Sequence, residues 1–353
     1  MSRTVFLDTV SPRPYDTRSF GQRAVQGTEA SVMRVADAMG AWVMQHNRGS
    51  AWERYLPVQH LATIENVVVI REPRALSLAR ELFPNARVHL WLHDKMRPGS
   101  KRGRRLRRTS ELLRAANVSV ICVSDTHRRD VLKTLLWAGI PGLPVCTRYN
   151  PLDAALRPDG TAFDDRQLVF FSSPNKGLAF ALDAFGALRR AMPDLRLVVG
   201  NPGYKADALA AIAGVEFLGP QPQALMHDQV RRSLCTFHPN FRIPETFGLV
   251  FAESHALGTP VLTHDFGAAA EVVGDPRQLL PVRAAYRCYE SLVGGLAPRW
   301  RQMPARLGAG LGLFDAYVER IREWRAGARP VVGPDPRFAL DTVAAQWREL
   351  LGP

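Results

Sequence analysis

Short apolar runs alternate with stretches of helical periodicity along the chain, and this alternation restricts the fold more than any other feature. Apolar runs bounded by turn residues indicate buried strands, whereas apolar residues that recur every three or four positions indicate helices. Strands that alternate with helices predict parallel, doubly wound sheets in an α/β fold. The pattern fills both halves, so we expect two doubly wound domains. The expected strands are residues 4–7, 41–45, 67–70, 86–92, 118–123, 145–149, 167–171, 195–200, 215–218, 234–238 and 261–262.

The composition is typical of a globular protein of the cytoplasm. The chain has 353 residues, enough for two domains, and 46% of them are hydrophobic. The four cysteines lack the paired spacing of metal or redox sites. The first residues lack the apolar core of a signal peptide, and no apolar run reaches the roughly 18 residues of a membrane span. We therefore expect a cytoplasmic location, with peripheral membrane contact where the charge favours it.

The positive charge lies almost wholly in the first half. The formal net charge is +13, and residues 1–160 hold 25 Lys/Arg against 14 Asp/Glu, whereas the remainder holds 21 against 19. This distribution indicates an acidic partner for the first half, such as a phospholipid membrane, a phosphate-bearing acceptor or nucleic acid.

One segment in that half concentrates the charge. Residues 95–108 carry eight basic side chains and no acid, and Gly99 and Gly103 predict that the segment is mobile. Each basic group is worth about 1 kcal/mol near an anionic membrane. The segment has no aromatic residue on which bases could stack, so an acceptor or a membrane is favoured over nucleic acid or a merely solvated loop. The basic residues are Lys95, Arg97, Lys101, Arg102, Arg104, Arg105, Arg107 and Arg108.

The stretch from Pro244 to Pro260 has the most specific chemistry. Apolar spacing predicts a helix over residues 247–257, ended by Gly258 and Pro260. Glu245 precedes this helix and Glu253 lies about two turns into it, so both carboxylates can face one pocket. The amides of the first turn suit a phosphate or pyrophosphate. They belong to Thr246, Phe247 and Gly248.

Two glutamates separated by seven residues, with Phe-Gly-Leu after the first and Gly-x-Pro-Val after the second, resemble the retaining nucleotide-sugar glycosyltransferases of group 1, a GT4-like family with the GT-B fold. The resemblance implies two Rossmann-like domains that face each other across a cleft. It also implies that Glu245 contacts the donor sugar, that Glu253 holds the ribose hydroxyls, and that the amides between them bind the diphosphate. The donor-binding set in this stretch is Thr246, Phe247, Gly248, Leu249 and Glu253.

Other positions match the family less completely. In the turn after residue 171, Lys176 matches a lysine that neutralises the leaving diphosphate, while Ser173 or its neighbour stands in place of an arginine. A cation is needed here because charge builds on the phosphate as the glycosidic bond breaks. His93 follows a predicted strand at the position of a histidine near the reacting carbon. The resemblance adds Gly27, Ser173, Asn175 and Gly219 as donor-binding residues.

The resemblance also implies a domain plan and an activity. We expect an acceptor domain over residues 1–160, a nucleotide-sugar domain over 161–335, and a last helix within 336–353 that packs back on the first domain. The reaction would move a sugar from a UDP- or GDP-linked donor to a glycan or lipid-linked acceptor, in cell-envelope polysaccharide assembly. No cofactor or metal is expected, and the chain has no Asp-x-Asp motif. A non-catalytic anion- or membrane-binding protein and a sugar-nucleotide epimerase of similar fold remain the alternatives. The base, sugar, acceptor, linkage and oligomeric state stay open.

Overall fold

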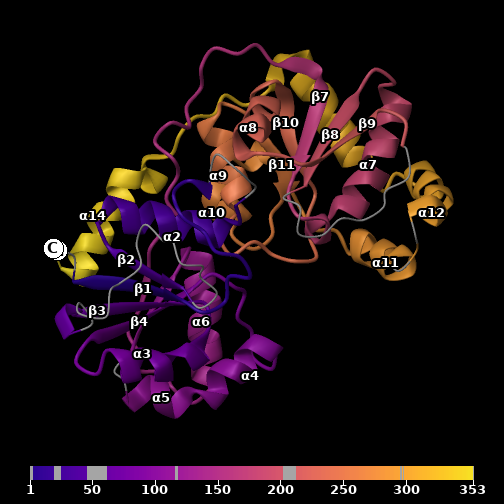
Figure 1. The fold of residues 1–353 in the computed structure, drawn as a ribbon. Helices are drawn as coiled ribbons and strands as arrows, with labels where there is room; N and C mark the ends of the chain where they lie inside the picture. The colour runs from indigo at the N-terminus through magenta and orange to yellow at the C-terminus, as the bar shows by residue number, and fades with distance from the viewer. Residues whose placement is uncertain are drawn as a thin grey trace. The chain divides into compact units, whose positions relative to one another are not determined.

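A computed structural model describes residues 3–19, 25–45, 62–115, 118–201, 212–294, 296 and 298–352. The chain divides into two units (Figure 1). In the described residues, the first unit comprises 3–19, 25–154 and 336–352, and the second comprises 155–335. The division after Ala154 comes a few residues before the expected boundary at 160, and the C-terminal segment belongs to the first unit.

The first unit is built on a six-stranded parallel sheet in the order β2-β1-β3-β4-β5-β6. Its strands are apolar on both faces because helices cover both sides. The strands are β1 (Thr4–Asp8), β2 (Trp42–Gln45), β3 (Asn66–Ile70), β4 (Arg87–Leu92), β5 (Ser119–Cys122) and β6 (Val145–Thr147). The helices are α2 (Gly27–Ala38), η2 (Pro73–Ala75), α3 (Leu76–Leu82), α4 (Lys101–Arg108), α5 (Ser110–Ala115), α6 (Asp125–Trp137), η6 (Pro336–Phe338) and α14 (Leu340–Leu351).

The last helix, α14, completes the core of the first unit. Trp347 is fully buried, and its ring lies 4.7 Å from that of Trp91 and 5.6 Å from that of Phe6. The side-chain amide of Asn66 donates to the carbonyl of Leu351 at 2.8 Å. Burying a tryptophan of this kind contributes several kcal/mol, because truncating one costs about 3–5 kcal/mol. The C-terminal segment is therefore part of the fold of this unit.

The second unit has a parallel sheet in the order β12-β11-β10-β7-β8-β9. The strands are β7 (Asp164–Phe171), β8 (Arg196–Asn201), β9 (Val215–Pro220), β10 (Ser233–His238), β11 (Val261–His264) and β12 (Leu279–Leu280). The helices are η3 (Pro174–Lys176), α7 (Leu178–Ala191), α8 (Gln223–Arg231), α9 (Leu249–Ala256), α10 (Ala269–Val273), η4 (Pro276–Gln278), α11 (Ala284–Val293), α12 (Pro298–Gly310), α13 (Asp315–Glu323) and η5 (Trp324–Ala328).

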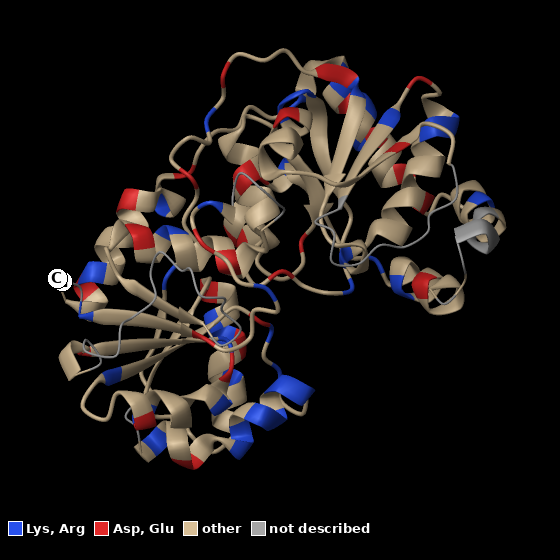
Figure 2. Cartoon of the chain, viewed as in Figure 1, with Lys and Arg blue, Asp and Glu red and all other residues tan. Residues whose placement is uncertain are grey.

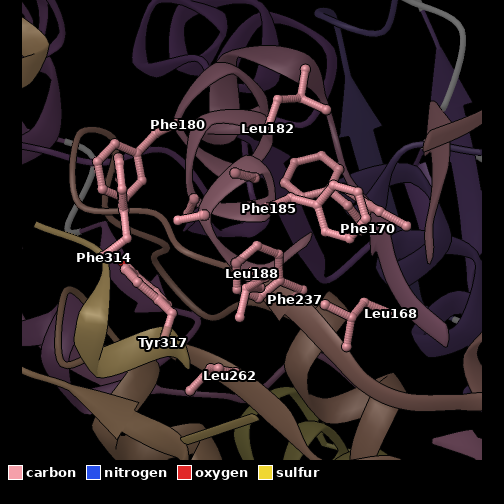
Figure 3. Close-up of a cluster of buried hydrophobic side chains, with 14 of the residues drawn as sticks. Leu168, Phe170, Phe180, Leu182, Phe185, Leu188, Phe237, Leu262, Phe314 and Tyr317 are labelled. Carbon is pink, nitrogen blue, oxygen red and sulfur yellow. The ribbon is translucent and has the colours of Figure 1, made fainter. Parts of the chain in front are cut away.

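The core of the second unit joins α7 and α13 to the central strands. Figure 3 shows aromatic and aliphatic side chains of these elements packed together. Phe180 on α7 lies 5.6 Å from Phe314 and 6.2 Å from Tyr317, measured between ring centroids. Phe170 and Phe237 approach from strands β7 and β10. The core therefore holds fixed the two strands whose ends carry the candidate site.

Two segments have local structure that apolar periodicity does not reveal. The segment after Arg97 forms the ordered helix α4, because Ser100 caps it by accepting from the amide of Gly103 at 3.0 Å. Gly103 allows the start of this helix to pack closely against the backbone of Arg97, because an added Cβ would lie 2.1 Å from the carbonyl oxygen of Arg97. After α12, residues 311–314 form a turn that leads into α13.

Among the helices of the described residues, none combines the length and the apolar character that crossing a membrane requires.

Candidate donor site in the second unit

The candidate site lies where the strand order of the second sheet changes direction. Strands β7 and β10 are neighbours at the centre of the sheet, and the chain proceeds outward from them in opposite directions. Loops at the carboxyl ends of two such strands diverge and leave a crevice that ligands occupy in open α/β sheets. These loops are residues 172–177 after β7 and 239–248 after β10. The topology therefore brings together two segments that the sequence analysis singled out separately.

Lys176 and Glu245 meet at this point. The Nζ of Lys176 donates to Oε2 of Glu245 at 2.9 Å, and the two side chains are 25% and 14% exposed. Lys176 ends the short helix η3, and Gly177 follows with φ of +101°, a left-handed conformation that turns the chain into α7. A half-buried ion pair of this kind holds both charged groups in place while leaving them within reach of a ligand.

His238 lies beside the ion pair and was not identified from the sequence. It ends β10 and is fully buried, with its ring stacked on that of Phe170 at 5.4 Å and in an edge-on contact with that of Phe251 at 5.3 Å. Neither ring nitrogen has a hydrogen-bond partner among the residues that the structure describes. Burial lowers the pKa of His238 to about 4, with Glu245 acting to raise it and Lys176 to lower it. A neutral imidazole therefore packs under the pair. The sequence signal that could have identified His238 was its position at the end of a central strand.

The backbone around Glu245 is fixed by the loop after β11. Glu245 pairs with Gly267 in an isolated parallel bridge, and the amide of Ala268 donates to the carbonyl of Glu245 at 3.0 Å. Gly267 has φ of +69°, and an added Cβ would lie 2.6 Å from the carbonyl oxygen of Glu245. Only glycine fits both the positive φ and the short distance to the carbonyl of Glu245. Gly267 therefore lets the two segments pack closely and fixes the backbone of Glu245.

We expect Gly267→Ala to lower the free energy of unfolding by more than Gly274→Ala does. Both glycines have positive φ, but nothing lies within 4 Å of a Cβ added at Gly274, so only Gly267→Ala adds a backbone clash. The strain alone costs about 1–3 kcal/mol at either site, and the clash adds to it at Gly267. Urea unfolding of both variants measures the difference. Equal losses would show that the contact with Glu245 does not restrict this position.

Helix α9 places the second glutamate. It begins at Leu249, two residues later than expected, because Gly248 adopts φ of +95° and acts as the N-cap. An added Cβ at Gly248 would lie 2.5 Å from the ring of Phe251. The amides of Leu249 and Val250 therefore belong to the first turn in place of those of Thr246 and Phe247. Such amides lack partners within the helix and favour an anion.

Glu253 is 6% exposed and is held by α8. The side-chain amide of Gln223 donates to its Oε1 at 2.9 Å, and Nε2 of His227 lies 4.0 Å from its Oε2. Neither α8 residue was identified from the sequence, because their role depends on a contact between separate helices. A carboxylate oriented in this way can accept hydrogen bonds from two neighbouring hydroxyl groups of a ligand.

The remaining residues that were predicted to bind the donor do not all lie close to the ion pair of Lys176 and Glu245. Ser173 is buried, and its hydroxyl donates a hydrogen bond to the side-chain oxygen of Asn175. This bond stabilises the turn that carries Lys176. Phe247 is also buried. Gly219 lies in β9, the strand at the edge of the sheet, with β8 between it and β7. The structure therefore groups Lys176, Glu245 and Glu253 with the start of α9 and places Gly219 farther along the sheet edge.

His93 belongs to the first unit, directly after β4 and at the carboxyl edge of its sheet. It is 9% exposed, and its ring lies 4.4 Å from that of Trp91. Burial lowers its pKa well below the usual value, and Arg71 and His127 act in the same direction. His93 is therefore neutral at physiological pH, and its contact with a donor sugar stays a prediction.

Gly27 begins α2. The carboxylate of Glu29, in the same turn, accepts from the backbone amide of Gln26 at 3.2 Å and from the hydroxyl of Ser11 at 2.6 Å. Glu29 is 3% exposed, so its side chain fixes the loops that precede the helix. Ligand binding by Gly27 stays a prediction.

The basic segment forms one face of the first unit. Figure 2 shows α4 almost wholly in the colour of Lys and Arg. Leu106 is fully buried and anchors the helix, so the charged side chains point outward. Some of the basic side chains form ion pairs with acidic residues. Arg102 pairs with Asp94 at 3.0 Å. Arg105 pairs with Glu72 at 2.6 Å, and Lys95 lies 3.8 Å from Asp130. The exposed members are Arg97, Lys101, Arg102, Arg104, Arg107 and Arg108.

The comparisons with known proteins concern both sequence and fold. The family described as Glycosyl transferases group 1 matches residues 157–280. A phosphatidyl-myo-inositol mannosyltransferase of Mycobacterium tuberculosis is 30% identical over 175 residues, which cover 47% of this chain and 46% of that protein. A D-inositol 3-phosphate glycosyltransferase of Nocardia farcinica is 31% identical over 264 residues, covering 65% of this chain and 56% of that protein. The chain thus spans about half the length of the curated relatives it matches.

Solved structures agree with the two-domain fold. The Anabaena protein HepE, solved in complex with UDP-glucose, matches 99% of both chains with a TM-score of 0.63 and 18% identity. Sucrose-phosphate synthase from Thermosynechococcus elongatus matches 98% of both chains with a TM-score of 0.59 and 14% identity. At such identities the likeness shows the fold alone, which is the predicted GT-B fold. The matched segment, residues 157–280, contains Lys176, Glu245 and Glu253, so the part of the chain that carries the candidate site is similar to the glycosyl transferases group 1 family.

Proposed function

We propose that this protein is a retaining glycosyltransferase that moves a sugar from a UDP- or GDP-linked donor to a glycan or lipid-linked acceptor. The observation that carries the proposal is the meeting of Lys176, Glu245 and the start of α9 at the switch point of the second sheet. A cation, a carboxylate and helix amides are the groups that a nucleoside-diphosphate sugar requires. The relatives that act on inositol-containing acceptors support a lipid or polyol acceptor in envelope assembly.

In this proposal the ion pair opens when the donor binds. Lys176 exchanges Glu245 for the diphosphate, and Glu245 then accepts hydrogen bonds from hydroxyls of the donor sugar. The bond between the anomeric carbon and the phosphate oxygen breaks, and negative charge develops on the diphosphate. Lys176 and the amides of Leu249 and Val250 stabilise that charge. The acceptor hydroxyl attacks from the face that the diphosphate leaves and passes its proton to the departing phosphate oxygen, so the new C–O bond forms with retained configuration and without a protein nucleophile.

The other groups complete the site. Glu253, oriented by Gln223, holds the ribose hydroxyls of the nucleotide. His93 keeps the role that the family resemblance implies, a neutral imidazole that acts on the donor sugar. Because Lys176 supplies the positive charge, the reaction requires no cofactor or metal. The direct test is to incubate the protein with UDP- and GDP-sugars and a lipid extract, and to determine the configuration of the product by NMR. An inverted product would contradict the retaining mechanism, and an epimerised free donor would support an epimerase.

The basic face of α4 is proposed to hold a phosphate-bearing acceptor at an anionic membrane. We expect the triple variant Arg104→Gln, Arg107→Gln, Arg108→Gln to bind vesicles containing phosphatidylinositol about a hundredfold more weakly, since three charges are worth roughly 1 kcal/mol each. The matched control removes three exposed arginines elsewhere, at Arg13, Arg157 and Arg322. Vesicle sedimentation at low and high salt measures both variants. Equal losses would show that net charge, and not this face, determines binding.

A further inference from the structure

The two helices that follow β12 carry an unusual set of exposed apolar side chains. Five large hydrophobic residues of this region are exposed: Leu292 by 80%, Leu296 by 41%, Met303 by 81%, Leu307 by 66% and Leu311 by 79%. Single exposed leucines are common on protein surfaces, but several within one short region indicate an interaction site. Figure 1 shows α11 and α12 together at one side of the second unit, on the side where α7 lies.

Three of these residues form a stripe along α12. Met303, Leu307 and Leu311 are four positions apart, and the amide of Leu311 donates to the carbonyl of Leu307 at 3.0 Å, so the helical path continues to the end of the stripe. Residues at this spacing share one face of a helix. The opposite face is turned to the protein, because Ala305 is buried and α12 packs on α7. The stripe therefore faces solvent and plays no part in the core described above.

Positive charges predominate near the stripe, and the exposed acid Asp315 lies beyond its C-terminal end. Residues 283–311 contain five arginines and one glutamate. That glutamate, Glu290, is 8% exposed and pairs with Arg242 at 3.2 Å, so it contributes little to the surface. Arg283, Arg287 and Arg306 are exposed. A second copy of this chain docked through the same face would bring these like charges together, which is unfavourable.

We propose that the α11–α12 surface, defined as Leu292, Leu296, Met303, Leu307, Leu311 and the arginines Arg283, Arg287 and Arg306, inserts into the interface of an anionic lipid bilayer. Apolar side chains on one helix face with arginines beside them are the features of helices that lie in the membrane interface. The leucines and the methionine enter the acyl boundary, and the arginines meet lipid phosphates. This surface is separate from α4 in sequence and chemistry, because α4 offers charge with its only leucine buried.

The test uses the full chain and vesicles of phosphatidylcholine, with or without phosphatidylglycerol. The stripe variant carries Met303→Ser, Leu307→Ser and Leu311→Ser. Its matched control carries Leu136→Ser, Leu225→Ser and Val331→Ser, which remove three apolar side chains that are 67%, 51% and 95% exposed elsewhere. All six positions are exposed, so both variants are expected to keep the wild-type melting temperature. We expect the stripe variant to bind the anionic vesicles at least about tenfold more weakly than wild type, and the control to bind like wild type.

Three results would overturn the proposal. Equal binding by the stripe variant and wild type would show that these side chains do not enter lipid, even if the α4 variant loses binding. Equal binding of wild type to vesicles with and without phosphatidylglycerol would remove the role of the arginines. A wild-type dimer that becomes monomeric in the stripe variant, measured by analytical ultracentrifugation without lipid, would assign the surface to a second copy. None of these measurements depends on sugar transfer, so they are independent of the proposed activity.

Discussion

Replacing Lys176 by methionine is expected to lower the rate of sugar transfer by about a hundredfold to a thousandfold, which is the usual cost of removing one group that stabilises developing charge. Lys176 is the cation at the switch point of the second sheet, held 2.9 Å from Glu245. Methionine keeps most of the side chain's volume and removes its charge. The loss should appear in kcat more than in KM, because the charge on the diphosphate is largest in the transition state.

Two further variants make this result specific. Lys133→Met removes an exposed lysine of the first unit and is expected to leave the rate unchanged. Glu245→Gln keeps the size of the side chain but removes the partner charge of Lys176, so it separates the role of the carboxylate from that of the cation. Initial rates with saturating and limiting donor measure all three variants. A Lys176→Met enzyme with wild-type kcat would contradict the assignment of Lys176 to the leaving diphosphate.

A second large effect is expected on stability in acid. The pKa of His238 is about 4 in the folded protein, because the ring is buried, whereas an unfolded histidine has a pKa near 6.5. Between these values the unfolded chain binds a proton that the folded chain does not. The stabilisation is therefore complete above pH 6.5 and is lost as the pH falls toward 4. From pH 7 to pH 5, His238 alone lowers the free energy of unfolding by roughly 2 kcal/mol.

The variant His238→Phe tests this value directly. Phenylalanine keeps an aromatic ring between Phe170 and Phe251, and it gives up no hydrogen bond to the described part of the chain, where the ring nitrogens have no partner. The difference in unfolding free energy between pH 7 and pH 5 should be about 2 kcal/mol smaller in the variant. His264, whose pKa burial lowers to about 3, keeps part of the acid sensitivity in both proteins. Urea unfolding at the two pH values gives the comparison. An unchanged difference would mean that His238 carries its proton in the folded state.

The sequence predicted the sheets well because a parallel strand is buried on both faces and appears as an apolar run. Strand β3 shows this pattern, with all five of its residues buried. Ends of helices were predicted less well. The start of α9 depends on the positive φ of Gly248, and the order of α4 depends on a contact between Gly103 and Arg97. Such features are set by backbone geometry that apolar periodicity does not reveal.

The residues of the candidate site could likewise be predicted only in part. Glu245, Glu253 and Lys176 could be chosen from local motifs, because their neighbours along the chain identify them. The ion pair joins Lys176 to a residue 69 positions away, and Gln223 reaches Glu253 from another helix. His238 was missed because a lone histidine after an apolar run has no distinguishing neighbours. Contacts between separate segments required the topology of the sheet, in which β7 and β10 lie side by side.

The measurement that tests the central claim most directly is calorimetric titration of UDP-, GDP- and ADP-sugars into the wild-type protein and Glu253→Ala, without added metal. The account predicts that one nucleotide sugar binds the wild type and that Glu253→Ala weakens this binding by at least about tenfold, because a buried carboxylate that accepts ribose hydroxyls is lost. Equal binding by both proteins would contradict the role of Glu253. Binding of none of the three sugars would contradict the donor site itself and favour a protein that binds anions or membranes without turnover.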